Sequence, residues 1–360
     1  MFDFLIIGGG IIGLLTAKEL QKTGAKVAII EKNSPGQQAT WAAGGILSPM
    51  RPWLYSSPVN AISSLSQVVY QQLSTELHDE TGIDPEWVLS GMLVLHDDEM
   101  AQAIQWCEQN NSPIEVLTVN ELSRQFGHLK PLGQTAIYRS DVATIKPHKL
   151  SAALTRYLTA KGVSFYNSQE AKQLTSTDQT ITGVQLANST VSAGEYIICG
   201  GAWSTQLIPD VCPKPIITPV KGQMLCFPPT ELSNLCMVMD GNRYIIPRKG
   251  GRIVVGSTRE NTDFDASTTQ AAYDDLKGFA QQLYPALANI EPDAHWAGLR
   301  PTSPQSIPYI CRVEPFNNLS LNAGHYRNGI VTAPASAELM ADILLNRITK
   351  IDTEPYKITR

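Results

Sequence analysis

Apolar runs and helix-like segments alternate along the chain from its first residues onward. Residues 2–7 are apolar except for Asp3, which is typical of a strand buried on both faces. Residues 14–21 predict a helix, and Gly24 supplies the residue that commonly follows a helix at the C′ position. Residues 26–30 predict a second strand. This order predicts a βαβ unit with parallel strands.

The rest of the chain alternates in the same way. Helices are expected over residues 62–77, 100–107, 147–160, 272–283 and 335–345, and strands over 91–95, 163–166, 243–247, 252–257 and 319–323. Pro334 fits the first turn of the last helix. The strands on either side of Arg248-Lys249-Gly250-Gly251 predict a hairpin. Because 360 residues exceed one compact core and no linker or repeat divides them, we expect two interleaved domains.

The amino-acid composition indicates which kinds of binding partner to expect. Charged residues make up 17% of the chain, and the formal net charge is −5. We therefore expect no nucleic acid and no membrane as partner, and no metal, since no zinc-ligand spacing occurs. The six cysteines form no CxxC pair, which favours buried, reduced thiols in a cytoplasmic protein. The apolar N-terminus lacks a basic flank and is too short to span a bilayer.

The most informative motif lies between the first predicted strand and helix. Gly8-Gly9-Gly10-Ile11-Ile12-Gly13 is a GxGxxG sequence. Gly8 permits the tight turn, Gly10 lets the backbone approach a pyrophosphate, and Gly13 lets the helix pack closely on the strand. Glu31, at the end of the second strand, suits ribose hydroxyls and argues against a 2′-phosphate. The motif predicts a dinucleotide site but leaves NAD and FAD unresolved.

Segments beyond this motif resemble the D-amino-acid oxidase family of FAD oxidoreductases in family order, and they are most similar to its glycine oxidase branch. The segments are residues 39–47, 196–204, 220–222, 244–248, 254–256, 296–301 and 323–330. The resemblance implies FAD as the cofactor, bound non-covalently because Leu299-Arg300 has no cysteine. It also implies a cytoplasmic homo-oligomer, such as a tetramer.

The resemblance gives the two predicted domains their roles. We expect an α/β fold (α+β overall), with a Rossmann-like FAD-binding domain interleaved with an antiparallel-sheet substrate-binding domain. The FAD-binding domain is assigned residues 1–50, 140–212 and 293–360, and the substrate-binding domain residues 51–139 and 213–292. The implied cofactor-binding residues are Gly8, Gly10, Ile11, Ile12, Gly13, Glu31, Lys32, Ala39, Thr40, Gly44, Gly45, Ile46, Ala171, Gly200, Trp203, His325, Tyr326, Arg327, Asn328, Gly329, Ile330 and Val331.

Three residues are candidates for substrate binding and catalysis. A guanidinium makes paired, charge-assisted bonds to a carboxylate, so an arginine suits an amino-acid anchor. The resemblance gives this role to Arg300 and places the Tyr244 hydroxyl on the same carboxylate. Arg327 would hold the flavin or assist at the substrate. The alternatives are a surface ion pair for Arg300, a core tyrosine for Tyr244 and a structural ion pair for Arg327.

Three further pocket positions depart from the glycine oxidase pattern. Ile46 and Arg259 stand where methionine is expected, and Asn242 stands where histidine is expected. Arg259 would favour very small or acidic substrates if it lined the site. Otherwise it would turn outward and pair with Glu260.

The implied reaction is oxidation of glycine, and also of sarcosine or small D-amino acids, by hydride transfer to FAD. Its products would be the imine, then glyoxylate and ammonia, with hydrogen peroxide formed from oxygen, and the imine would feed thiazole formation in thiamine biosynthesis. Hydride transfer from a neutral amine needs no general base, and a helix N-terminus at residues 329–334 would stabilise the reduced flavin. The alternatives are a D-amino-acid dehydrogenase that reduces a quinone, an NAD-dependent dehydrogenase and a non-catalytic flavin-binding subunit.

Overall fold

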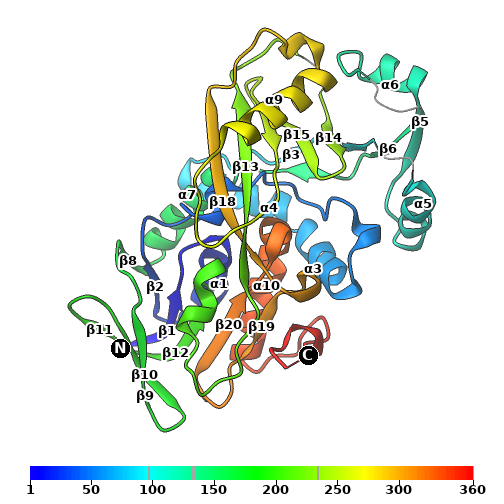
Figure 1. Ribbon diagram of the computed structural model, residues 1–360. Helices are drawn as coiled ribbons and strands as arrows, with labels where there is room; N and C mark the ends of the chain where they lie inside the picture. The colour runs from blue at the N-terminus through cyan, green and yellow to red at the C-terminus, as the bar shows by residue number, and fades with distance from the viewer. Residues whose placement is uncertain (96–97, 131–134, 233–234, 360) are drawn as a thin grey trace.

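A mainly parallel sheet forms the first half of the fold in the computed structural model, which describes residues 1–95, 98–130, 135–232 and 235–359 (Figure 1). Its strand order is β19-β20-β12-β1-β2-β8, and only β19 runs antiparallel to its neighbour. The strands are β1 (Phe2–Ile7), β2 (Val27–Glu31), β8 (Ser164–Asn167), β12 (Ala193–Ile198), β19 (Tyr309–Arg312) and β20 (Leu319–Ala323). The predicted βαβ unit is confirmed, with α1 (Ile11–Gln21) as its helix.

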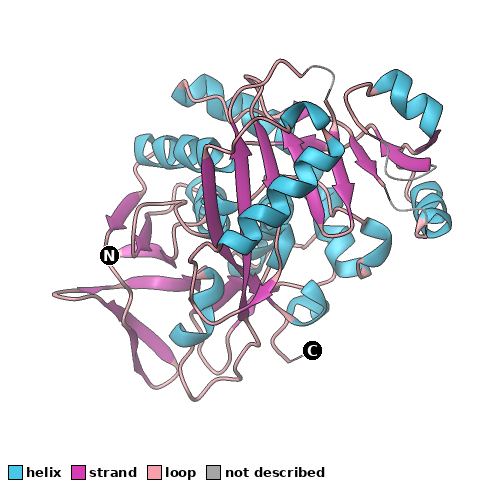
Figure 2. Ribbon diagram, turned by 45° about the horizontal axis from the view of Figure 1, so that its top comes forward, coloured by secondary structure: helices cyan, strands magenta, loops and turns pink. Residues whose placement is uncertain are grey.

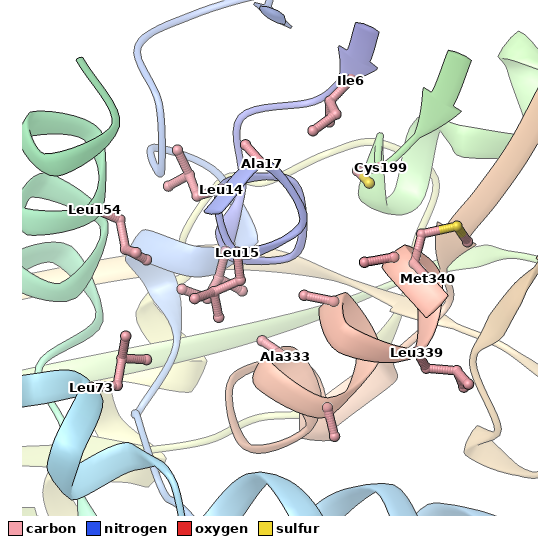
Figure 3. Close-up of a cluster of buried hydrophobic side chains, with 14 of the residues drawn as sticks. Ile6, Leu14, Leu15, Ala17, Leu73, Leu154, Cys199, Ala333, Leu339 and Met340 are labelled. Atoms are coloured by element: carbon pink, nitrogen blue, oxygen red, sulfur yellow. The ribbon is translucent and has the colours of Figure 1, made fainter. Parts of the chain in front are cut away.

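Both faces of this sheet are covered, which explains the continuous apolar run of β1. Ile6 packs into a core with α1, α7 (Pro147–Ala160) and α10 (Gly329–Leu344), as Figure 3 shows for Leu14, Leu154 and Met340. Leu5 and Ile7 point to the other face. There they meet a small antiparallel sheet of β9 (Gln173–Thr177), β10 (Thr180–Gln185) and β11 (Thr190–Val191).

A larger, mainly antiparallel sheet forms the other half. Its order is β17-β13-β16-β15-β14-β4-β6-β5, with β18 paired along β13. The strands are β4 (Met92–Val94), β5 (Glu115–Thr118), β6 (Thr135–Arg139), β13 (Thr218–Phe227), β14 (Met237–Asp240), β15 (Arg243–Pro247), β16 (Ile253–Gly256), β17 (Glu260–Asn261) and β18 (Ala294–Thr302). Helix α9 (Gln270–Leu283) crosses one face of this sheet (Figure 2), and the fold class is as predicted.

The two halves interleave along the chain. Helices α3 (Ser57–Gln67) and α4 (Tyr70–Thr81) pack into the core of the parallel sheet, although they come from the segment assigned to the substrate-binding domain. Strand β18 comes from the segment assigned to the FAD-binding domain but pairs with the antiparallel sheet. The remaining elements are α2 (Ala39–Ala42), β3 (Val88–Leu89), α5 (Met100–Gln109), α6 (Val119–Gln125), β7 (Ala143–Thr144) and α8 (Ser204–Leu207).

Most predicted elements are found, and two helices differ from expectation. The hairpin at residues 243–257 is confirmed, with Tyr244 opposite Gly256. The single helix predicted over residues 62–77 is wrong, because the chain forms α3 and α4 with a break at Val68 and Val69. These β-branched residues are poor helix formers. There the Val69 N–H bonds to the Ser66 carbonyl, one residue closer than in an α-helix.

The last long helix begins six residues before the predicted start. Helix α10 starts at Gly329, so Pro334 lies inside it rather than in its first turn. Proline cannot donate to the carbonyl four residues earlier, which is that of Ile330. The buried Tyr70 hydroxyl donates to that carbonyl instead, and Ser66 Oγ accepts the Ala335 N–H at 2.9 Å. Tertiary partners therefore compensate for a proline that the sequence pattern places at a helix start.

Two global features follow from the described residues. No helix among them combines the length and apolar character needed to cross a bilayer. All six cysteines lie in the described part of the chain, where they are buried and form no disulfide, as predicted.

Candidate active site

One long cavity runs from the carboxyl ends of the parallel strands to the antiparallel sheet. Its lining includes most of the residues predicted for the site: Gly8, Gly10, Ile11, Ile12, Glu31, Lys32, Ala39, Thr40, Gly44, Gly45, Ile46, Ala171, Gly200, Trp203, Tyr244, Arg300, His325, Tyr326, Arg327, Asn328, Gly329 and Ile330. Four predicted residues, Gly13, Val331, Asn242 and Arg259, lie outside that lining. Ligands of open α/β sheets bind at this strand edge.

The glycine loop is shaped by the lack of side chains. Gly8 has φ +116°, and a Cβ there would lie 2.4 Å from the Cys199 carbonyl oxygen. A Cβ on Gly13 would lie 2.0 Å from the Gly8 carbonyl oxygen. Gly13 therefore does not line the cavity. Its lack of a side chain lets α1 approach β1 closely. The loop leaves open space where a pyrophosphate would approach the N-terminus of α1.

Two side chains fix the loop from outside. Thr40 Oγ1 accepts the Ile11 N–H at 2.9 Å. The buried Glu31 carboxylate accepts the N–H groups of Gly9 at 2.8 Å and Asn33 at 2.9 Å. A carboxylate has about four lone-pair sites, so Glu31 retains capacity for ribose hydroxyls.

A cation–π pair lies at the same end of the cavity. Lys32 Nζ is 3.3 Å from the centroid of the Trp203 ring, and both residues line the cavity with Ala171. Burial lowers the pKa of Lys32, and the nearby carboxylates of Glu31 and Glu170 partly offset that effect. The pair gives this end a flat surface and a positive charge beside the loop.

Polar groups without partners line the middle of the cavity. Asn322 Oδ1 and Asn328 Nδ2 are buried and make no hydrogen bond among the residues that the structure describes. Buried polar atoms are normally paired, so an acceptor and a donor left open point to a polar ligand. With the glycine loop, these open polar atoms fit a polar dinucleotide such as FAD. The N-terminus of α10 opens onto this region at Gly329, where its dipole would favour negative charge.

His325 is a buried residue in the lining of this region. It is 2% exposed, and its Nε2 lies 3.0 Å from Ser336 Oγ. Burial lowers the pKa of His325 to about 3. The imidazole is therefore neutral at physiological pH and serves as a packed, hydrogen-bonded side chain.

Arg300 lies at the other end of the cavity, on β18. Its Nη2 donates to Ser257 Oγ at 2.8 Å, and its Nη1 donates to the carbonyls of Lys221 and Thr258, both at 3.3 Å. A Cβ on Gly222 would lie 1.9 Å from Nη2, so Gly222 makes room for the guanidinium. These bonds hold the group in place and leave part of its five-donor fork open to the cavity.

Tyr244 faces the same space from β15. Its side chain is 6% exposed, and its hydroxyl donates to Met224 Sδ at 3.3 Å. A thioether is a weak acceptor, so a carboxylate in the cavity would be a stronger partner. A Cβ on Gly44 would lie 3.5 Å from this hydroxyl, which places Tyr244 directly against the 44–45 loop.

Two of the remaining predicted substrate residues line the cavity, and two lie outside it. Ile46 is half-buried in the lining, and Arg327 is part of it. Asn242 is exposed and outside the lining, and it accepts a hydrogen bond at 3.3 Å from Nη1 of Arg327, which lies in the lining. Arg259 is exposed and outside the lining, and Glu260 pairs with Lys221 at 3.2 Å.

Sequence reasoning missed a residue that joins the two halves. Arg248, at the turn of the β15–β16 hairpin, donates to the carbonyls of Ile145, at 3.0 Å, and Gly44. Burial lowers the pKa of Arg248 to about 10, which still leaves it charged at neutral pH. Its place in a predicted turn gave no sign of this role, because the carbonyls it binds are distant in sequence.

Comparison with known proteins gives the class of the molecule. The model of the DAO family, described as FAD dependent oxidoreductase, matches residues 3–343. The chain therefore belongs to this family of FAD-dependent oxidoreductases, and its cofactor is FAD. The predicted family and cofactor are thereby confirmed.

Individual relatives extend over the whole chain. Glycine oxidase of Pseudomonas aeruginosa is 38% identical over 353 residues, which is 98% of this chain and 97% of that protein. The bifunctional protein ThiO/ThiG of Nostoc sp. is 30% identical over 96% of this chain, which spans 53% of that protein. The crystal structure of glycine oxidase from Geobacillus kaustophilus superposes with a TM-score of 0.95 at 29% identity, covering 100% of this chain and 98% of that one.

Proposed function

We propose that this chain oxidises glycine to its imine, which water hydrolyses to glyoxylate and ammonia while oxygen is reduced to hydrogen peroxide. Family membership and the full-length similarity to glycine oxidases make it an FAD-dependent amino-acid oxidase. The substrate and the residue roles are the proposal. The observation that carries them is Arg300, held in place at the end of the cavity with part of its donor fork open.

Arg300 binds the substrate carboxylate in this proposal. Its neighbours on the protein are neutral oxygens, so its charge is available to an anion. The Tyr244 hydroxyl exchanges its weak bond to Met224 for a bond to the same carboxylate. Two fixed donors on one carboxylate set the orientation of the carbon that reacts.

FAD supplies the hydride acceptor when bound. The protein contributes the frame around it: Gly44 and Gly45 on one side, Asn322 and Asn328 with open polar atoms, and the N-terminus of α10. That helix end favours negative charge in the cavity. Tyr244 against Gly44 brings the carboxylate site next to this frame, which favours small substrates such as glycine, sarcosine and small D-amino acids.

The setting of the reaction is part of the proposal. Similarity to glycine oxidases and to a ThiO/ThiG protein supports a role in thiamine biosynthesis, in which the imine feeds thiazole formation. Buried cysteines without disulfides suit the cytoplasm. A homo-oligomer is proposed from the family resemblance.

Flavin bleaching tests the function directly. We expect glycine, added without oxygen, to bleach the flavin absorption of the purified holoenzyme, and air to restore it with hydrogen peroxide. A parallel assay with a quinone-like dye measures the competing dehydrogenase reaction. If no small amino acid bleaches the flavin, the proposed function is wrong. If the dye is reduced while no peroxide forms, the dehydrogenase is the better description.

A further inference from the structure

Arg300 is held by oxygen atoms whose own positions must be fixed. Two of the three oxygens that its guanidinium binds belong to Ser257 and Thr258, and the third is the Lys221 carbonyl. Ser257 and Thr258 lie between β16 and β17, outside both strands. The geometry at the guanidinium therefore depends on what holds these two residues.

Strand β13 carries the substrate site on one face and a polar network on the other. Because side chains alternate between the faces of a strand, Gly222 faces the cavity while Lys221 and Gln223 point to the opposite side. On the cavity side, Gly222 makes room for the guanidinium of Arg300. On the opposite side, Lys221 is 5% exposed and Gln223 is fully buried. Two such polar side chains need partners directly behind the substrate site.

Glu260 is the shared partner in this network. Its carboxylate accepts the Thr258 hydroxyl at 2.5 Å and the Gln223 side-chain amide at 2.8 Å. It also lies 3.2 Å from Lys221 Nζ. The Gln223 N–H donates to Thr258 Oγ1 at 2.9 Å, which fixes the hydroxyl from its other side. Burial raises the pKa of Glu260, but these hydrogen bonds lower it by more, so the carboxylate is charged at neutral pH.

We propose that Glu260 is a positioning residue, which holds Thr258 and Ser257 so that Arg300 meets the substrate carboxylate in a fixed orientation. Glu260 lies outside the cavity lining, so it acts through Arg300 rather than on the ligand. This inference rests on the proposed function, since it takes Arg300 as the carboxylate site. A small displacement of the guanidinium weakens both of its paired bonds to a carboxylate, because they depend on one geometry.

Asp265 provides a matched comparison within the same network. It lies 3.3 Å from Lys221 Nζ, so Lys221 has two carboxylate partners. Asp265 is exposed, and it also accepts hydrogen bonds from Ser267 in its own loop. Glu260, in contrast, also binds Thr258. Loss of the Asp265 carboxylate therefore changes the charge beside Lys221 without releasing Thr258.

Ligand binding to the holoenzyme separates these two carboxylates. Methylthioacetate carries the substrate carboxylate without an oxidisable amine, and methylthioacetamide is its uncharged counterpart. Their Kd values can be read from changes in flavin absorption. Glu260→Ala should weaken methylthioacetate binding by roughly tenfold, and Glu260→Gln by roughly threefold, since glutamine can still accept from Thr258. Methylthioacetamide binding should stay unchanged in both variants, and Asp265→Asn should leave both Kd values unchanged.

A double-mutant cycle shows whether the effect passes through Arg300. In the Arg300→Ala background, Glu260→Ala should leave methylthioacetate binding unchanged, because the group that it positions is gone. With Arg300 present, Glu260→Ala should raise KM for glycine more than it lowers kcat, since binding of the carboxylate is what Arg300 supplies. FAD affinity should stay at the wild-type value.

Equal weakening of both ligands by Glu260→Ala, or an undiminished effect in the Arg300→Ala background, would overturn the positioning role. If Glu260→Ala does not fold, the same two comparisons with Glu260→Gln decide the matter. Failure of the wild-type holoenzyme to oxidise any small amino acid would refute the proposed function instead. Methylthioacetate binding would still test Glu260 in that case, because it requires no turnover.

Discussion

The two ends of the cavity are built by different means. At the glycine-loop end, one continuous βαβ unit presents backbone, and its shape depends on the missing side chains of Gly8 and Gly13. At the arginine end, Tyr244, Arg300 and Arg327 come from β15, β18 and the segment after β20. The first end is a local structure, and the second exists only after sheet pairing.

This difference changes how each end holds a charged ligand. The glycine-loop end offers N–H groups and a helix dipole, with Glu31 and Thr40 keeping the loop in place. The arginine end offers full charges whose neighbours are mostly neutral acceptors. A substitution at the first end should therefore act through shape, and one at the second end through charge.

The largest effect is expected from Gly13→Ala. The new Cβ would meet the Gly8 carbonyl oxygen at 2.0 Å, and backbone cannot rotate away as a side chain can. We expect about 3 kcal/mol of lost stability, since overpacking at a backbone contact forces a shift. FAD affinity should fall with it. Thermal unfolding of the apoprotein and titration with FAD would measure both.

Gly278→Ala is the matched control. Gly278 is exposed on α9, and a Cβ there meets nothing within 4 Å. Alanine should raise helix stability by up to about 1 kcal/mol. Equal effects of the two substitutions would show that the loop does not depend on close packing.

Arg300→Ala is expected to act next most strongly, through charge. Removing one member of a shielded charge pair should weaken glycine binding by about 3 kcal/mol. This corresponds to roughly a hundredfold rise in KM where KM reflects binding. FAD affinity should stay near the wild-type value, because Arg300 lies at the other end. A KM equal to the wild-type value would falsify the role of Arg300.

Arg248→Met tests the connection between the two ends. It would leave the Gly44 and Ile145 carbonyls without their donor, at a cost of about 2 kcal/mol in stability. Because Gly44 lines the cavity, FAD affinity should also fall. Lys249→Met, at the exposed neighbour paired with Asp84, should change stability by less than about 0.5 kcal/mol. Similar losses in both variants would contradict a specific role for Arg248.

An effect on stability about as large as that of Arg248→Met concerns pH and His325, which follows β20 and forms a β-bridge with Thr302 of β18. Its folded pKa is about 3, below the unfolded value of about 6.5. As pH falls, the unfolded chain therefore takes up the proton before the folded protein does. The stability that the neutral, buried imidazole contributes is complete above about pH 6.5 and is lost as pH falls toward 3. We expect a loss of about 2 kcal/mol between pH 7 and 5.

Urea unfolding at the two pH values would measure this loss. His325→Asn should reduce the difference between them, because asparagine can still bond to Ser336 but does not titrate. A pH dependence that is unchanged in this variant would assign it to other groups.

Several features could be predicted because they depend on neighbours in the sequence. The βαβ unit, the glycine loop and the 243–257 hairpin follow from strand patterns, turn residues and their spacing. The break between α3 and α4 was missed because only two residues tighten the helix there. The early start of α10 was missed because Tyr70 and Ser66 compensate for Pro334 from a distant segment.

By itself, the sequence determined the dinucleotide loop and the family, and through the family the cofactor. These depend on short ordered motifs in which each residue acts on its neighbours. Only the tertiary structure decided that Arg248 joins the two halves, that Arg259 lies outside the cavity and that Arg327 faces it without a carboxylate partner among the described residues. The physical reason is that burial and charge pairing are set by segments distant in sequence, which come together only when the two sheets pack.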